Sequence, residues 1–366
     1  MLTPQEELAN LEEQGLLRSL QKISSPSPPT VTIDGRELIN FSSNDYLGLA
    51  QHPALIEAAT KAIQDYGTGA TASRLVCGSL DLFHQLEERI ASGKKTEAAL
   101  TFANGYATAV GTIPALVGKN DTIILDKLSH ACLIDAARLS GSTLRIFPHN
   151  DLNKLEKLLS SSKGRTLVVT ESVFSMDGDL CPLADIVFLK EKHGALLLLD
   201  EAHAVGVLGS NGQGLADELG LQNQVDFQMG TLGKALGSAG GYLASSRDWI
   251  DLVINKARSF IYSTAPPPAQ AAASLAAFKI LASREGADRR QLLLSHCKRF
   301  DASTPIIPRI IGGNDEAVAA SKRLRGKGFL VPAIRYPTVA RGTARLRITL
   351  SASHTDLQIS DLLKAL

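Results

Sequence analysis

The amino-acid sequence predicts an α/β protein built on a large, doubly wound and mostly parallel β-sheet. Continuous apolar runs, which suit strands buried on both faces, alternate with helix-like segments along the middle of the chain. In addition, polar residues directly follow several of these runs, as they do at the ligand-binding edge of open α/β sheets. The expected strands are residues 98–102, 122–125, 144–147, 167–170 and 195–199.

The segments on either side of this region predict smaller parts. Residues 5–23 have the apolar spacing of an amphipathic helix, and a Ser/Pro-rich linker and two small strands around a turn at Asp34-Gly35 follow it. Helices are expected at 152–159 and 183–193, and an Ala-rich helix follows the turn at 266–268 and runs to about 283. We therefore predict three parts, which are an N-terminal helix with small strands (1–50), a large domain (51–284) and a smaller α+β C-terminal domain (285–366).

Composition excludes several classes of function. The 366 residues include 38 basic and 37 acidic side chains, a balance that favours binding neither to nucleic acid nor to an anionic membrane. The acidic N-terminus resembles neither a secretory signal nor a transit peptide, so we expect a cytoplasmic protein. The four cysteines form no C-x-x-C pair; we therefore expect reduced, mostly buried thiols and no metal site.

Chemically useful side chains stand directly after the predicted strands. Asp200 and His203 follow the run 195–199, and Lys234 follows an apolar stretch within the small-residue sequence Gly-Thr-Leu-Gly-Lys-Ala-Leu-Gly-Ser. Asp200 to His203 also spell a helicase DEAH box, but the phosphate loop that such an enzyme needs is missing from the sequence. Because the carboxyl ends of parallel strands share one edge of a sheet, these residues are expected to converge there.

This set of residue types matches the demands of pyridoxal 5'-phosphate (PLP) chemistry. A lysine amine must form an imine with the cofactor aldehyde, and a carboxylate must face the pyridine nitrogen. Lys234 and Asp200 meet those two demands. The phosphate needs backbone N–H groups at the start of a helix, which Gly105 and Tyr106 offer together with the hydroxyl of Thr231. An imidazole or phenol, at His130 or Tyr106, can cover the ring.

The chain resembles the α-oxoamine synthase family of fold-type I PLP-dependent transferases over essentially its whole length. Six stretches of the sequence carry this resemblance, and they are residues 40–49, 128–131, 173–178, 200–203, 231–234 and 342–347. The family joins an amino acid to an acyl thioester with loss of carbon dioxide. The resemblance therefore implies an acyltransferase that works as a homodimer with shared active sites.

The resemblance also implies roles for individual residues. Lys234 would carry PLP as a Schiff base and move the substrate α-proton, and Asp200 would pair with the pyridinium nitrogen. His203 would contact the ring oxygen with Ser175 nearby, while His130 would stack on the ring face. Gly105, Tyr106 and Thr231 would hold the cofactor phosphate, and Ser263 and Thr264 would reach the phosphate of the other subunit. Arg347 would bind the amino-acid carboxylate. The path of the acyl group would be lined by Arg18, Asn44 and Thr338.

Residues 260–264 and 336–339 favour the member of the family that uses L-alanine and a pimeloyl thioester, carried by coenzyme A (CoA) or by acyl carrier protein. Three other activities of the family stay possible from the sequence, namely those of glycine C-acetyltransferase, 5-aminolevulinate synthase and serine palmitoyltransferase. Two alternatives outside these activities are a PLP aminotransferase and a non-catalytic subunit of this fold. The sequence also departs from the family. Alanines occupy part of the segment 69–74, Cys77 stands where Ser is usual, and the stretch 300–307 is short.

Overall fold

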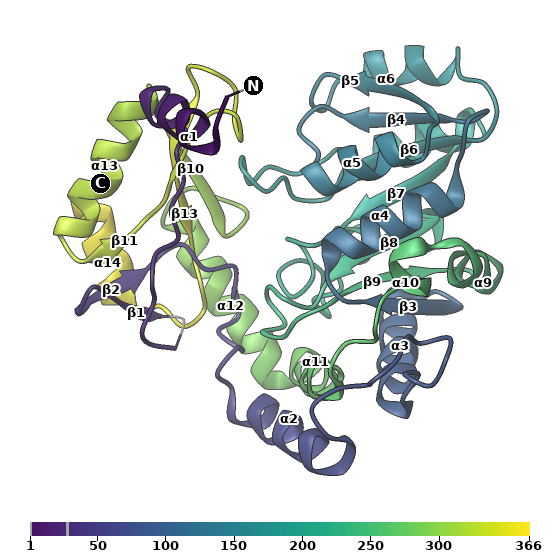
Figure 1. The fold of residues 1–366 in the computed structure, drawn as a ribbon, viewed down its shortest axis with the longest axis horizontal. Helices are drawn as coiled ribbons and strands as arrows, with labels where there is room; N and C mark the ends of the chain where they lie inside the picture. The colour runs from purple at the N-terminus through teal and green to yellow at the C-terminus, as the bar shows by residue number, and fades with distance from the viewer. Residues whose placement is uncertain (1, 27–28) are drawn as a thin grey trace. The chain divides into compact units, whose positions relative to one another are not determined.

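The computed structural model describes residues 2–26 and 29–366, and they form two compact units. The larger unit comprises residues 47–175 and 179–292, and the smaller comprises the described residues up to 46, together with 176–178 and 293–366. Figure 1 follows the chain through both units. The N-terminal and C-terminal segments, which we predict from the sequence to be separate parts, thus belong to one unit.

A seven-stranded sheet forms the centre of the larger unit, in the order β3-β9-β8-β7-β6-β4-β5. Strands β8, β7, β6, β4 and β5 pair in parallel, whereas β9 is antiparallel to both of its neighbours. The strands are β3 (Ala98–Phe102), β4 (Thr122–Asp126), β5 (Thr143–Phe147), β6 (Thr166–Glu171), β7 (Leu196–Asp200), β8 (Phe227–Thr231) and β9 (Gly241–Ser245). The predicted doubly wound, mostly parallel sheet is confirmed.

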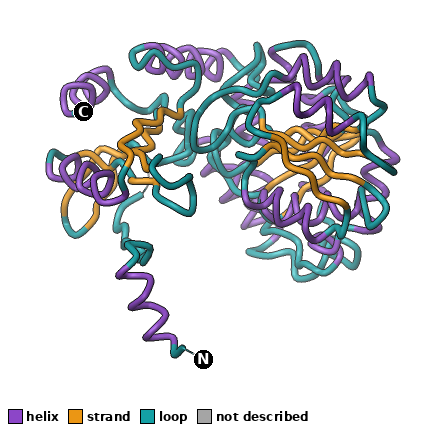
Figure 2. The backbone as a smooth tube through the Cα atoms, turned by 90° about the horizontal axis from the view of Figure 1, so that it is seen from above, coloured by secondary structure: helices purple, strands orange, loops and turns teal. Residues whose placement is uncertain are grey.

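Helices cover both faces of this sheet, as Figure 2 shows by the purple segments on either side of the orange strands. Helices α2, α3 and α11 pack together, while α4 packs against α5, α9 and α10. The helices that lie wholly in the larger unit are α2 (Pro53–Tyr66), α3 (Asp81–Lys94), α4 (Gly105–Leu116), α5 (Ala131–Leu139), α6 (Leu152–Leu159), α7 (Leu183–Lys192), α8 (Leu215–Glu218), α9 (Arg247–Lys256), α10 (Arg258–Ile261) and α11 (Pro268–Leu281), with a 3-10 turn η1 (Gln222–Gln224). No described helix is both long and apolar enough to cross a lipid bilayer.

The apolar sequence of the central strands explains their burial. All five residues of β3 and β4 are buried, and so are the last four residues of β7. Strands with both faces covered need continuous rather than alternating apolar residues. The main cluster of buried side chains accordingly includes Leu100, Ile123, Leu167, Leu198 and Phe227 from five strands of the sheet. The polar residues that end these strands are therefore held on a rigid layer.

The smaller unit is an α+β assembly with two three-stranded sheets, ordered β1-β2-β11 and β10-β13-β12. Strands β1 and β2 pair around the predicted turn at Asp34-Gly35. Its elements are α1 (Pro4–Glu13), β1 (Thr30–Ile33), β2 (Arg36–Asn40), β10 (Ile306–Gly312), α13 (Asn314–Gly326), β11 (Phe329–Leu330), β12 (Ala333–Ile334), β13 (Ala344–Thr349) and α14 (Asp356–Ala365). The boundary between the two units falls within α12 (Arg284–Lys298).

Two predictions made from the sequence are wrong. The first helix ends at Glu13 instead of continuing to residue 23, because Gly15 has a φ of 64°, in the left-handed region that ends helices. Beyond that point, Leu16 is half-buried and Leu20 is fully exposed. Cys77 is exposed, although the other three cysteines are buried as expected.

Candidate active site

The carboxyl ends of the parallel strands in the larger unit surround a pocket of about 170 Å³. This is the edge at which open α/β sheets bind ligands. The pocket contains residues from the turns after β3, β4, β7 and β8, so side chains far apart in the sequence converge there. Its lining includes the predicted residues Gly105, Tyr106, His130, Asp200, His203, Thr231 and Lys234.

Lys234 lies in the loop after β8, and His203 lies in the turn after β7. The ε-amino nitrogen of Lys234 is 2.8 Å from Nε2 of His203. His203 is buried, whereas Lys234 is partly exposed to the pocket. A primary amine at this position is both reachable and held by a neighbouring group, as a nucleophilic lysine requires.

Asp200 ends β7 and lies at the floor of the pocket. Its Oδ1 accepts a hydrogen bond of 2.9 Å from the backbone N–H of Ala202. Burial raises the pKa of Asp200, while the positive charge of Lys234 and the bond from Ala202 favour its ionised form. A buried carboxylate held in this way suits a cationic partner inside the pocket.

His130 is the N-cap of α5, and its ring nitrogen Nδ1 accepts the backbone N–H of Cys132 at 3.2 Å. The proton of the neutral ring therefore resides on Nε2. Burial lowers the pKa of His130, so the imidazole is neutral around neutral pH. The backbone N–H of His130 donates to Oε1 of Glu171, which ends the neighbouring strand β6. A neutral imidazole, held at Nδ1 on a backbone that is itself fixed by Glu171, can lie flat against an aromatic ligand.

The N-terminus of α4 points its first N–H groups at the pocket. Asn104 caps the helix by accepting the N–H of Ala107 at 2.8 Å, while the N–H groups of Gly105 and Tyr106 belong to the turn without intrahelical acceptors. Thr231 lies beside Gly105, and its hydroxyl donates to the carbonyl of Gly240 at 2.9 Å. The dipole and the N–H groups of such a helix start favour an anion, including a phosphate.

The predicted substrate contacts Arg347, Asn44, Arg18 and Thr338 all lie in the smaller unit. Arg347 is buried, and both of its terminal nitrogens donate to Oδ1 of Asn44 at 3.3 Å. Arg18 donates to the hydroxyl of Thr338 at 3.5 Å, and both side chains line a cavity of about 290 Å³ with Arg335. These four residues thus form two pairs within that unit.

Three further predicted residues lie in the larger unit but not among those that line the pocket. Ser175 is buried four residues beyond the end of β6, and Ser263 and Thr264 follow α10 on a more exposed loop. The segment after Ser175 belongs to the smaller unit, where Asp177 pairs with Arg345 at 2.5 Å. Gly178 has a φ of 73°, and a Cβ there would collide with the carbonyl oxygen of Ile306. This close approach explains why glycine ends that segment.

Sequence reasoning assigned no role to several residues that the structure brings into the pocket. They are Cys132, Glu171, Ala202, Met229 and Gly230. Among them, Glu171 carried a signal, because it ends a predicted strand in the same manner as Asp200. The other four are apolar or small, and nothing in their local sequence distinguishes them from core residues.

Comparisons with known proteins agree with this geometry. Residues 36–366 match the family model described as aminotransferase class I and II. The 8-amino-7-oxononanoate synthase of Geobacter sulfurreducens is 48% identical over 373 residues, covering 98% of this chain and 95% of that protein. The enzyme of the same name from Geotalea daltonii is 45% identical and covers 100% of this chain and 97% of its own.

A solved structure shows the same fold. The serine palmitoyltransferase of Sphingomonas wittichii is 31% identical, with a TM-score of 0.92 over 99% of this chain and 94% of that one. Other structures of serine palmitoyltransferase that match this chain contain PLP.

Proposed function

This chain belongs to the family of 8-amino-7-oxononanoate synthases, and we propose that it is a PLP-dependent acyltransferase of biotin biosynthesis. The reaction condenses L-alanine with pimeloyl-CoA, or with pimeloyl-acyl carrier protein. It releases the carrier thiol and carbon dioxide and gives 8-amino-7-oxononanoate. The single observation that carries the proposal is the convergence of Lys234, Asp200, His203 and His130 on one pocket at the carboxyl edge of the sheet.

The residues of the pocket fit PLP group by group. When bound, PLP supplies an aldehyde that forms an imine with an amine, and a protonated ring that accepts electrons from the substrate. Lys234 offers the amine, and Asp200 offers a buried carboxylate for the ring nitrogen. The start of α4, at Gly105 and Tyr106, offers N–H groups for the phosphate, with Thr231 beside them.

Each side chain then has a defined task. With PLP bound, the amine of Lys234 would act as the general base for the substrate α-proton, and His203 at 2.8 Å would orient that amine. Asp200 would hold a proton on the ring nitrogen of PLP. His130, whose neutral ring accepts the N–H of Cys132, would cover the ring face. We assign to Ser175 a supporting contact near His203.

In this proposal, residues of the smaller unit bind the amino-acid carboxylate and the acyl group. Arg347 presents two terminal nitrogens, the arrangement that matches a carboxylate, and Asn44 occupies them in this structure. A pimeloyl group ends in a second carboxylate. The cavity of about 290 Å³ that contains Arg18, Arg335 and Thr338 has the cationic lining that such an end requires.

We also propose that the chain is a homodimer. Leu75, Val76 and Tyr262 are large apolar side chains that are 53%, 78% and 72% exposed. The loops that carry them are joined by a β-bridge between Ser73 and Thr264. Exposed apolar groups on adjoining loops mark an interaction surface, and Ser263 and Thr264 in that surface would reach the second copy's phosphate site. Light scattering of the purified protein should give twice the chain mass.

A panel of amino acids and acyl donors tests the function. Alanine, glycine and serine are each paired with pimeloyl-, acetyl-, succinyl- and palmitoyl-CoA, and with pimeloyl-acyl carrier protein, and the products are identified by mass spectrometry. The proposal expects the highest kcat/KM for alanine with a pimeloyl donor. A higher value for glycine or serine with another donor would assign the chain to a different α-oxoamine synthase activity. Amino transfer from alanine to a keto acid without a thioester would assign it to the aminotransferases.

A further inference from the structure

Glu171 lines the active-site pocket, yet it has no task in the function proposed above. It ends β6 and pairs in register with Asp200 at the end of β7. Neighbouring strands lie about 4.8 Å apart, and paired residues of parallel strands present their side chains on the same face. The two carboxyl groups are thus neighbours, and their residues are only 2% and 5% exposed.

The charges around this pair do not balance if both carboxyl groups are ionised. Lys234 is the cation that acts on both of them. His130 and Cys132 also face the pair; burial lowers the pKa of the imidazole and raises the pKa of the thiol, so neither is charged around neutral pH. Asp126, at the end of β4, adds negative charge, but it is itself paired with His149.

Two buried carboxylates beside the single cationic nitrogen of Lys234 repel each other, which favours a proton on one of them. Burial, reinforced by the negative charge of Asp200, raises the pKa of Glu171 to about 8 against the opposing effect of Lys234. For Asp200, by contrast, Lys234 is the largest influence after burial, and it favours the ionised form. The proton is therefore better placed on Glu171.

We propose that Glu171 is a positioning residue that stays protonated beside Asp200 and fixes the backbone of His130 through its other carboxyl oxygen. The proton resides on Oε2, because Oε1 accepts the N–H of His130. This inference rests on the proposed function in one respect, which is that the charge of Asp200 is kept for the cofactor ring nitrogen. When Glu171 is neutral, it does not compete with Asp200 for the positive charge of the ring nitrogen. Its hydrogen bond to the backbone N–H of His130, the N-cap of α5, holds the imidazole in place.

Infrared spectroscopy of the purified enzyme tests the protonation directly. A protonated carboxyl group gives a C=O stretching band that an ionised carboxylate lacks, and ¹³C-labelled glutamate moves the band only if a glutamate carries the proton. We expect such a band at neutral pH in the wild type, moved by the label and absent from Glu171→Gln. We also expect it to weaken in Asp200→Asn, because Glu171 then loses the negative neighbour that raises its pKa. A band that persists in Glu171→Gln, or that moves only with labelled aspartate, would overturn the proposal.

Matched variants distinguish a positioning role of Glu171 from a purely structural role. Glu171→Gln keeps the shape and the acceptor for His130 without a charge, so kcat/KM should stay within about threefold of the wild type. Glu171→Leu removes the acceptor and should lower kcat/KM about tenfold or more, mainly in kcat. The exposed control Glu191→Gln should change neither the band nor the rate. A Glu171→Gln enzyme as impaired as Glu171→Leu would show that an ionised carboxylate is needed, against the proposal. The infrared result does not depend on which substrates react, so it fails or succeeds separately from the donor panel.

Discussion

Nζ of Lys234 and Nε2 of His203 lie 2.8 Å apart at the carboxyl edge of the central sheet. The two residues come from loops that follow neighbouring strands, β8 and β7, so their contact depends on the parallel pairing of those strands. An amine so placed can form an imine with an aldehyde in the pocket.

The first prediction concerns this amine. Replacing Lys234 by Ala removes the only group proposed to bond covalently to PLP, so the visible absorbance of the purified enzyme should disappear together with turnover. The matched control is Lys119→Ala, which changes an exposed lysine and should leave both properties intact. An unaltered visible spectrum in Lys234→Ala would refute the assignment of the cofactor lysine.

A second prediction concerns the shape of the Arg347 side chain. Lys carries the same charge but cannot offer two parallel N–H groups, so Arg347→Lys should raise the KM for alanine roughly tenfold or more. The KM for the pimeloyl donor should change much less, because its carboxylate is assigned to another cavity. Steady-state kinetics with each substrate varied in turn provide the measurement, with exposed Arg36→Lys as the control. Equal effects on both KM values would contradict the assignment.

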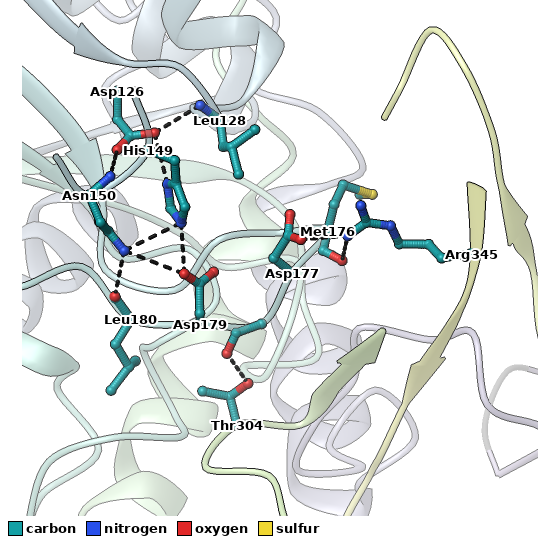
Figure 3. A network of polar contacts seen from close by, with 11 residues as sticks. Asp126, Leu128, His149, Asn150, Met176, Asp177, Asp179, Leu180, Thr304 and Arg345 are labelled. Carbon is teal, nitrogen blue, oxygen red and sulfur yellow. Dashed lines mark hydrogen bonds and ion pairs between the residues drawn. The ribbon is translucent and has the colours of Figure 1, made fainter. Parts of the chain in front are cut away.

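A third prediction concerns the pH dependence of stability. His149 bridges Asp126 and Asp179 with its two ring nitrogens, at 3.0 and 2.7 Å, as Figure 3 shows. Burial alone would lower the pKa of His149, but hydrogen bonds to the two carboxylates raise it to about 10.

Because the pKa of His149 is higher in the folded state, its protonation stabilises the folded protein. This stabilisation is complete below pH 6.5, the pKa in the unfolded state, and is lost as the pH rises through about 10. The free energy of unfolding of the wild type should therefore fall across this window. His149→Gln should be less stable at neutral pH and should show a flatter profile, measured by urea denaturation at each pH. Parallel profiles for the two proteins would show that His149 is not the group responsible.

A fourth prediction concerns a buried ion pair in a segment where the sequence departs from its family. Arg74 donates two hydrogen bonds to Glu87, of 2.8 and 3.0 Å, and a third of 3.2 Å to the hydroxyl of Thr101. Arg74→Met leaves the Glu87 carboxylate buried without its cation, which should cost about 3–5 kcal/mol of folding free energy.

The double variant Arg74→Met/Glu87→Gln should recover part of that loss, because neither side chain is then a buried unpaired charge. A double-mutant cycle by chemical denaturation measures the coupling between the two residues. If the losses of Arg74→Met and Glu87→Gln simply add in the double variant, the two side chains are not coupled.

The strands of the large sheet were predictable because their apolar runs are continuous and local. Residues 98–102 form β3 as expected. The predicted runs differ from β4 and β5 by one residue at one end, and from β6 and β7 by one residue at each end. The N-terminal helix was predicted too long because leucine periodicity continues past Gly15, which ends the helix. The antiparallel β9 was not predicted, because Gly241–Ser245 has few large apolar residues and lies among small ones.

The alternation of buried strands and helices, and the polar side chains at each strand's end, follow from the amino-acid sequence alone, because both depend on short runs of neighbouring residues. Which of these strand ends meet depends on the three-dimensional fold. Glu171 and Asp200 stand 29 positions apart in the chain, and their shared face follows from the register between β6 and β7. The coupling of their charges depends on burial and separation, which the folded sheet sets and no local pattern encodes.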